Sequence, residues 1–276
     1  MGYKLIACDL DETLLDDNHR IAKKNCDAIK KAREKYGIKF VLATGRGVKQ
    51  VRYELEELGL NELEDEYVIS FNGAVLSENK DNKIFQFNGL TFEKVKEIFQ
   101  AGLKYNVCQF INTIDTVYIY NADDAQKQKL KRQRIDAVYF EKPDIEFLKD
   151  KPICKMLYQS NDLNFLMSLE KELSSIVAGC VTVSYSSNQY MEFNALGIDK
   201  GKGLIDLANK LGIDIKDTIA IGDNYNDISM LKASGLAVGA NNAAEDVKNI
   251  CDYVTMADNN EGVVAEVIER YIFNEI

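Results

Sequence analysis

Short apolar runs alternate with helix-like segments at both ends of this 276-residue chain, and this alternation strongly restricts the folds that it can adopt. The expected strands are residues 4–8, 39–43, 67–71, 218–221, 236–238 and 252–255, and the expected helices are 21–36, 48–58, 202–211 and 228–233. Apolar strands joined by helices are typical of a parallel sheet covered on both faces. We therefore predict an α/β domain with a doubly wound parallel sheet, built from both ends of the chain.

The middle of the chain has a different pattern, rich in Tyr, Phe, Gln and Asn. Adjacent strand-like runs favour hairpins, at residues 109–114 with 116–120 and at 180–186 with 189–193. Helical spacing at residues 91–105 and 163–173 completes an α+β unit. We predict a core domain of residues 1–83 plus 191–276, with an inserted α+β domain at residues 84–190.

Charge and cysteine usage narrow the class of protein. The formal net charge is −10, and an acidic surface repels nucleic-acid phosphates, which disfavours a nucleic-acid partner. Apolar runs stay well below the ~18 residues of a membrane span, so we expect no membrane association. The six cysteines are scattered without zinc-ligand spacing, which favours reduced thiols and a soluble, cytoplasmic protein.

Two carboxylates follow the first expected strand. Asp9 and Asp11 are two residues apart, so in extended backbone they project to the same side. Close carboxylates repel unless a cation lies between them or one is protonated. A metal-bound carboxylate can attack phosphorus, and a second carboxyl can act as general acid and base. This pair alone is also typical of a solvated acidic loop.

Polar clusters follow two further expected strands. Thr44-Gly45-Arg46 offers a hydroxyl, backbone amides and a guanidinium to phosphate oxygens, although Thr44 alone is also a common helix N-cap. In the segment from Gly222 to Asp227, Asp223 is a natural oxygen ligand for Mg²⁺. The alternative for this segment is a capped turn.

Lys200 lies in a glycine-rich segment before a helix, where it could neutralise a phosphate and an attacking carboxylate. The segment is not a P-loop, because three residues rather than four separate Gly197 from Gly201 and Gly203 follows Lys202. A solvated lysine is the alternative.

The order Asp-x-Asp-x-Thr, Thr-Gly-Arg, Lys-Gly and Gly-Asp-x-x-Asn-Asp resembles the haloacid dehalogenase superfamily, and more narrowly its Cof-type sugar-phosphatase branch. The motifs run from Asp9 to Asp227, so the resemblance spans nearly the whole chain. That branch carries a large α+β cap between the second and third motifs, where the insertion is predicted here. Glu12 is a departure, since members often have glycine at that position.

The resemblance implies a Mg²⁺-dependent hydrolase of small phosphate monoesters, either sugar phosphates or phosphorylated cofactors, that acts through an aspartyl-phosphate intermediate. Asp9 would be the nucleophile and a metal ligand. Asp11 would be the general acid and base and would give its main-chain carbonyl to Mg²⁺. Asp223 would complete the metal ligands, with Asp227 supporting them. The implied phosphate- and substrate-binding residues are Thr44, Gly45, Arg46, Lys200 and Asn226.

The cap of that branch selects the leaving group, which makes Glu192 and Asn194 candidate contacts to substrate hydroxyls; ordinary strand positions are the alternative. Two other functions stay open from the sequence. A sugar phosphomutase would need a phosphorylated sugar as activator. A non-catalytic metabolite sensor is the other, and the intact Asp9, Asp11, Lys200 and Asp223 count against it.

Overall fold

The computed structural model describes residues 2–133 and 135–274 of the chain. The chain divides into two compact units, a core unit of Met1–Gln86 with Asp199–Ile276 and an inserted unit of Phe87–Ile198. These boundaries differ from the predicted insertion at residues 84–190, most clearly at its end. The strand at Tyr190–Ala195 hydrogen-bonds with the sheet of the inserted unit. A boundary at residue 190 would separate this strand from the sheet to which it belongs.

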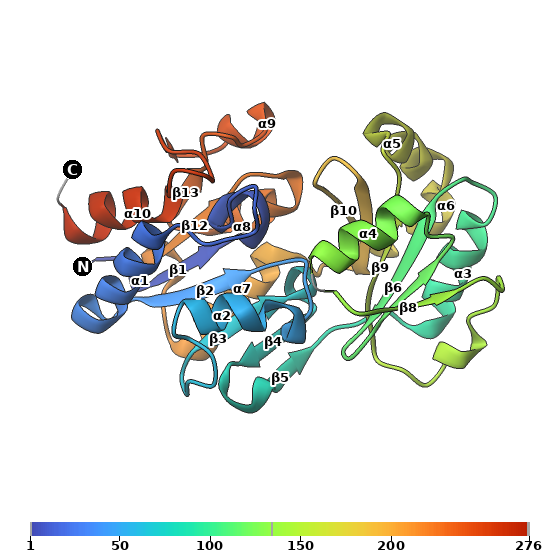
Figure 1. Cartoon of the computed structure of the whole chain (residues 1–276), viewed down its shortest axis with the longest axis horizontal. Helices are drawn as coiled ribbons and strands as arrows, with labels where there is room; N and C mark the ends of the chain where they lie inside the picture. Colours follow the sequence, from blue (N-terminus) through green and yellow to red (C-terminus); the bar gives the residue numbers. More distant parts are fainter. Residues whose placement is uncertain (1, 134, 275–276) are drawn as a thin grey trace. The chain divides into compact units, whose positions relative to one another are not determined.

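An eight-stranded sheet forms the centre of the core unit (Figure 1). Its order is β14 (Tyr253–Val254), β13 (Leu236–Gly239), β12 (Thr218–Gly222), β1 (Leu5–Cys8), β2 (Lys39–Ala43), β3 (Tyr67–Ser70), β4 (Val75–Glu78) and β5 (Lys83–Phe87). The strands from β14 to β3 pair in parallel, which confirms the predicted α/β class. β4 runs antiparallel to β3, an extension that the sequence analysis did not predict.

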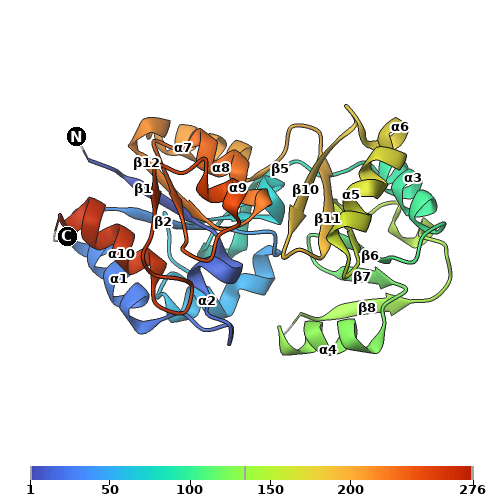
Figure 2. The ribbon, with the colours of Figure 1, turned by 90° about the horizontal axis from the view of Figure 1, so that it is seen from above.

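Helices cover both faces of this sheet, as Figure 2 shows. One face packs against α1 (Lys23–Tyr36), α2 (Arg52–Glu57) and α10 (Val263–Ile268), and the other against α7 (Lys200–Leu211), α8 (Ile228–Ala233) and α9 (Glu245–Lys248). Strand β1 has apolar side chains on both faces of the sheet, so both faces must be shielded from water. Ile6 and Cys8 pack on the face covered by α1, α2 and α10, and Leu5 and Ala7 pack on the face covered by α7, α8 and α9.

The inserted unit is an α+β structure around a six-stranded sheet. The sheet order is β10 (Val181–Ser186), β11 (Tyr190–Ala195), β9 (Ile153–Gln159), β6 (Cys108–Thr113), β7 (Val117–Tyr120) and β8 (Ala137–Phe140). Neighbours pair antiparallel except β7 with β8. One face packs on α3 (Phe92–Gly102), α5 (Leu163–Glu172) and α6 (Ser174–Val177), and Leu130 of α4 (Asp124–Arg132) packs on the other.

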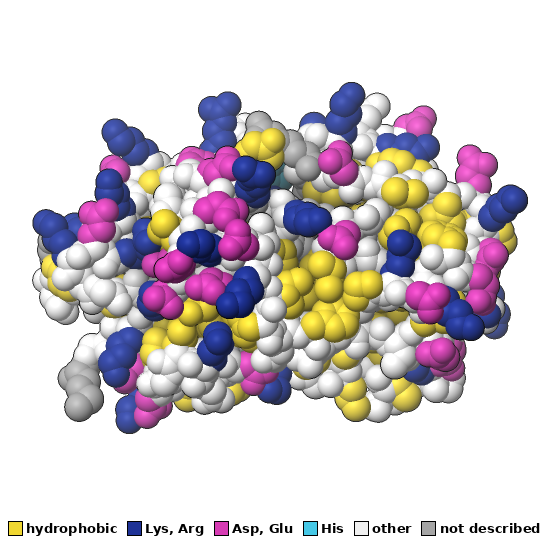
Figure 3. Space-filling model, turned by 90° about the horizontal axis from the view of Figure 1, so that it is seen from below, with side chains coloured by type: hydrophobic (Ala, Val, Ile, Leu, Met, Phe, Trp, Pro, Cys, Tyr) yellow, Lys and Arg dark blue, Asp and Glu magenta, His cyan; other side chains and the backbone are white. Residues whose placement is uncertain are grey.

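Surface charge is mixed on the face that Figure 3 displays, where Lys and Arg side chains alternate with Asp and Glu rather than forming a continuous basic band. None of the helices in the described part of the chain has the length and apolar content needed to cross a membrane.

Glycines allow the first turn of α7 to come close to the end of β3. Gly73 has φ +90°, and a Cβ built there would lie 2.2 Å from the carbonyl oxygen of Asp199, the residue just before α7. A Cβ at Gly203 would lie 2.6 Å from the Ile69 side chain. The start of α7, and with it Lys200, is therefore held at the carboxyl edge of the core sheet.

We expect Gly73→Ala to destabilise the protein by about 2–4 kcal/mol, because a left-handed conformation and a backbone clash add together. Gly212→Ala is the matched control: Gly212 also has a positive φ, but its added Cβ would meet open space, so the cost should be about 1 kcal/mol. Chemical denaturation measures both values, and equal losses would contradict the close approach at Gly73.

Candidate active site

Three neighbouring strands of the core sheet end in polar residues at the same edge. Asp9 follows β1, Thr44 follows β2 and Asp223 follows β12, and β1 pairs in parallel with both of the other strands. The Asp9 amide donates to the carbonyl oxygen of Ile221 at 2.9 Å, which fixes the backbone of Asp9 against β12. Ligands of open parallel sheets bind at this carboxyl edge.

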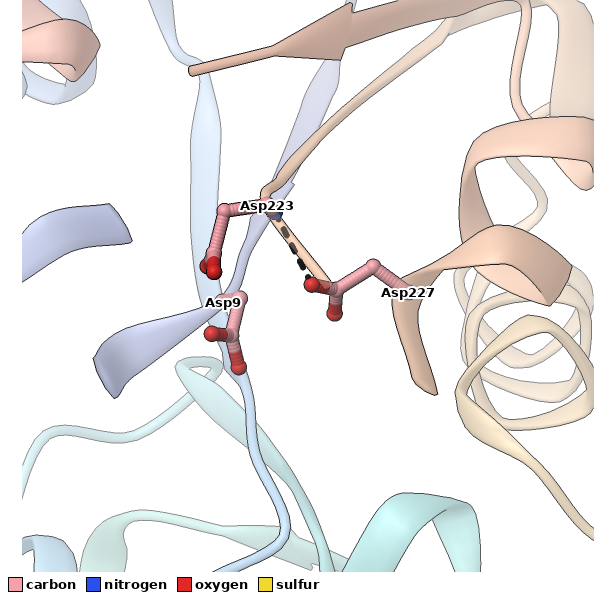
Figure 4. A group of neighbouring side chains, drawn as sticks. All are labelled: Asp9, Asp223 and Asp227. Carbon is pink, nitrogen blue, oxygen red and sulfur yellow. Dashed lines mark hydrogen bonds between the residues drawn. The ribbon is translucent and has the colours of Figure 1, made fainter. Parts of the chain in front are cut away.

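Three buried carboxylates meet at this edge (Figure 4). Asp9, Asp223 and Asp227 each place one oxygen within 4.8 Å of the others. The sequence analysis expected Asp9 and Asp223 in one site and Asp227 beside them, and the structure brings all three together.

The ammonium group of Lys200 lies among these carboxylates. Its Nζ donates to Asp9 Oδ1 and, at 2.6 Å, to Asp227 Oδ1. The Lys200 side chain is fully buried, which excludes the solvated alternative for this lysine. Burial by itself would lower the pKa of Lys200, but Asp227 and Asp9 raise it above its ordinary value, so the ammonium stays charged.

Asp227 organises the loop that carries Asp223. While Asp227 Oδ1 accepts from Lys200, its Oδ2 accepts from the backbone amides of Asp223 and Asn224, both at 3.0 Å. Protein donors thus occupy both oxygens, which suits a supporting role better than a ligand role. Asn226 lies half-buried in the same turn, Tyr225–Asp227.

The pKa of Asp9 is raised to about 7, mainly by burial and next by Asp227, against an opposing decrease from Lys200. Burial also raises the pKa of Asp223 well above its ordinary value, and Asp9 adds to the increase. Burial out of water is the larger cause of both increases, and repulsion between the close carboxylates adds to it. An added cation would relieve this repulsion.

The donor set fits Mg²⁺. When all three carboxylates are ionised, they and the one ammonium leave two negative charges at the site, which one divalent cation balances. All candidate donors are hard oxygens, the ligands that Mg²⁺ prefers. Asp9 and Asp223 have the oxygens best able to hold the ion.

Thr13 is a site residue whose role the sequence analysis missed. It is completely buried, and its hydroxyl donates to Asp223 Oδ1, so it orients that carboxylate. The loop after β13 also contributes, since the Ala244 amide donates to the carbonyl oxygen of Asp223 at 3.0 Å. The threonine in the Asp-x-Asp-x-Thr pattern was the available signal for Thr13.

Thr44 and Gly45 follow β2 at the same edge. The Thr44 hydroxyl accepts from the Arg46 amide at 3.0 Å, which leaves its own proton available for a ligand oxygen. The next helical turn begins only at Val48, after Gly47 as N-cap, so Thr44 is not the N-cap that we considered.

Asp11 pairs with Arg46. Arg46 Nε donates to Asp11 Oδ2 at 2.9 Å, and Arg46 Nη2 donates to Asp11 Oδ1. The same guanidinium donates through Nη1 to Glu54 Oε1 at 3.0 Å. Glu54 was absent from our sequence-based candidates.

Glu192 and Asn194 lie on β11 of the inserted unit, where both are buried. Glu192 Oε2 accepts from Lys155 Nζ and Glu192 Oε1 accepts from the Ser186 hydroxyl. Glu192 therefore belongs to a buried ion pair within its own unit, and Lys155 of β9 was missed because that strand was not predicted.

Glu12 has φ +63°, a left-handed conformation that is unfavourable for residues other than glycine. This turn takes the chain from Asp11 to Thr13. A glycine, which is common at this position in the superfamily that the sequence resembles, would adopt this conformation without strain.

The whole chain is similar to known hydrolases. The sequence matches the family described as haloacid dehalogenase-like hydrolase over residues 6–268. A solved haloacid dehalogenase-like hydrolase from Bacteroides thetaiotaomicron is 32% identical, with a TM-score of 0.81 over 98% of this chain and 99% of that one. The 5-amino-6-(5-phospho-D-ribitylamino)uracil phosphatase YcsE of Bacillus subtilis is 29% identical over 99% of this chain and 97% of its own length.

A third similarity concerns the fold alone. The subclass IIB sugar phosphatase BT4131 is 24% identical, with a TM-score of 0.84 over 99% of this chain and all of that chain.

We expect Mg²⁺ to raise the melting temperature more at pH 8 than at pH 6. The folded-state pKa of Asp9 is raised to about 7, so without metal the contribution of Asp9 to stability falls as pH rises from about 4 through 7, because the folded state holds a proton that the unfolded state does not. Mg²⁺ competes with that proton, and its affinity should rise about tenfold between the two pH values. Thermal unfolding with and without Mg²⁺ measures this.

The effect of Mg²⁺ should be lost in Asp223→Asn and kept in Asp124→Asn, a control whose side chain is 93% exposed. A stabilisation by Mg²⁺ that is independent of pH, or that survives in Asp223→Asn, would contradict the assigned ligands.

We expect Glu12→Gly to increase the free energy of unfolding by about 0.5–1 kcal/mol, because relief of the left-handed strain outweighs the added entropy of the unfolded chain. Glu12→Ala keeps the Cβ and should change little. Urea denaturation distinguishes the two variants, and an equal effect of both would refute backbone strain as the cause.

Proposed function

The chain belongs to the haloacid dehalogenase-like hydrolase family, and we propose that it catalyses Mg²⁺-dependent hydrolysis of small phosphate monoesters through a phosphorylated Asp9. The group of Asp9, Asp223 and Asp227 around the buried Lys200 is the observation that supports this proposal most directly. Phosphoryl transfer needs positioning and positive charge more than covalent chemistry from the protein. The carboxylates position the reacting groups, and the Lys200 ammonium together with a bound Mg²⁺ would supply the positive charge.

In the first step, the carboxylate of Asp9 attacks phosphorus and the bond to the leaving oxygen breaks. Asp11 gives its proton to that oxygen, which departs as an alcohol. Lys200 and the Thr44 hydroxyl hold the equatorial phosphoryl oxygens, with the Gly45 amide beside them. Bound Mg²⁺, held by Asp9, Asp223 and the main-chain carbonyl of Asp11, would offset the negative charge of the phosphoryl group.

In the second step, Asp11 has become a carboxylate and removes a proton from water. The resulting hydroxide attacks the phosphorus of phospho-Asp9, the acyl phosphate bond breaks, and inorganic phosphate leaves. Asp9 and protonated Asp11 are thereby restored. Asp227 keeps Lys200 and the Asp223 loop in place throughout both steps.

We further propose sugar phosphates or phosphorylated cofactors as substrates. YcsE, which is 29% identical over 99% of this chain, is named for a phosphorylated ribitylamino-uracil substrate, and this relative supports the proposal. Arg46 and Asn226 of the core unit are the proposed contacts to the leaving group. Glu192 and Asn194 stay sequence-based predictions of hydroxyl contacts, and both oxygens of Glu192 already accept from Lys155 and Ser186 within the inserted unit. A cytoplasmic location is part of the proposal, supported by the six unpaired cysteines.

The test is phosphate release from a panel of hexose, pentose and ribityl phosphates and phosphorylated cofactors, with Mg²⁺ or with EDTA. We expect Mg²⁺-dependent release by the wild type and a loss of about 10³-fold or more in Asp9→Asn. Asp124→Asn is the control and should keep full activity. Release that survives in Asp9→Asn would remove Asp9 as nucleophile, and no release from any compound would contradict the phosphatase proposal.

A further inference from the structure

We propose that Glu54 is a positioning residue that acts through Arg46 to hold the carboxyl group of Asp11 in the orientation needed for proton transfer to the leaving group. This inference rests on the proposed function, in which Asp11 is the general acid. All three residues belong to the core unit.

All three guanidinium nitrogens of Arg46 donate hydrogen bonds to the carboxylates of Asp11 and Glu54. Its Nε and Nη2 donate to the two oxygens of Asp11, while Nη1 donates to Glu54 Oε1 at 3.0 Å. A planar fork with contacts on two sides can adopt one orientation only. The orientation of Asp11 therefore depends on what holds the far side of the guanidinium.

The backbone of Arg46 is itself fixed. Its amide donates to Thr44 Oγ1 at 3.0 Å and its carbonyl oxygen accepts from the Phe71 amide at 2.9 Å. With the backbone held in this way, Glu54 contacts the guanidinium at the end away from Asp11.

Glu54 occupies a position where packing alone would favour an apolar residue. It lies on α2 in a buried stripe with Val51, Leu55 and Leu58. Its residue exposure is 9%, and its Oε2 is buried without a hydrogen-bond partner among the described residues. Burial of an incompletely bonded carboxylate is unfavourable. Its contact with Arg46 gives a reason for a carboxylate at this position.

Asp11 needs this support because its side chain is the most exposed of the three. Its side chain is 32% exposed, against 9% for Arg46 and 11% for Glu54. General acid catalysis requires the donor to lie within hydrogen-bond reach of the leaving oxygen. Without Glu54 the guanidinium would keep its two contacts with Asp11 but could shift together with it, and Asp11 would then lose its single orientation.

The test compares two leaving groups in Glu54→Ala. A sugar phosphate releases an alkoxide that needs a proton, whereas p-nitrophenyl phosphate releases a stable phenolate that does not. The quantity is kcat/KM, which covers the steps up to departure of the leaving group. We expect a fall of about tenfold for the sugar phosphate and less than about twofold for p-nitrophenyl phosphate.

Two further variants complete the experiment. Glu54→Gln keeps an oxygen that can accept from Arg46, so its kcat/KM for the sugar phosphate should lie between those of the wild type and Glu54→Ala. If Glu54→Ala fails to fold, the two leaving groups are compared in Glu54→Gln instead. Glu56→Ala is the matched control, because Glu56 lies on the same helix, is exposed and pairs with Arg52. Its kinetics should match the wild type with both substrates.

Equal losses with both leaving groups would show that Glu54 only maintains the structure, and no loss with either would show that Arg46 needs no such anchor; both outcomes overturn the inference. Failure of the proposed function is a separate result, since the wild type itself would then release no phosphate from either compound.

Discussion

The paired contacts of Lys200 with Asp9 and Asp227 are the interaction on which the arrangement of the site depends. Buried carboxylates that lie this close repel one another, and the ammonium group offsets part of that repulsion. Lys200 stands in the first turn of α7, where the helix dipole is unfavourable for a cation. The carboxylates therefore stabilise the lysine as much as the lysine stabilises them, and removal of either partner would leave a buried charge unpaired.

The topology of the core sheet explains how residues distant in the sequence meet around this lysine. β1 lies between β2 and β12, and the polar residues after all three strands come to one edge because the strands are parallel. The chain leaves this sheet for the inserted unit and returns at Asp199, just before Lys200. An insertion at this point leaves the three neighbouring strands undisturbed, so the inserted unit can vary without loss of the charged cluster.

Much of the core and of its charged cluster could be predicted from the sequence, because apolar strands that end in Asp or Thr-Gly-Arg give a strong local pattern. The antiparallel strand β4 and the central strand β9 of the inserted unit were not predicted. β9 contains Lys155, whose burial depends on Glu192 of a neighbouring strand. Glu54 was missed for a similar reason, since its partner Arg46 lies in another element and only the tertiary structure brings them together.

The most direct measurement is a rapid acid quench of the wild-type enzyme during turnover of p-nitrophenyl phosphate, whose leaving group needs no proton from Asp11, followed by mass spectrometry of its peptides. Our account predicts one phosphoryl group on the peptide that contains Asp9, which increases in Asp11→Asn because the second step lacks its base, and is absent in Asp9→Asn. A phosphoryl group on a different residue, or steady turnover without any phosphorylated enzyme in either protein, would contradict it.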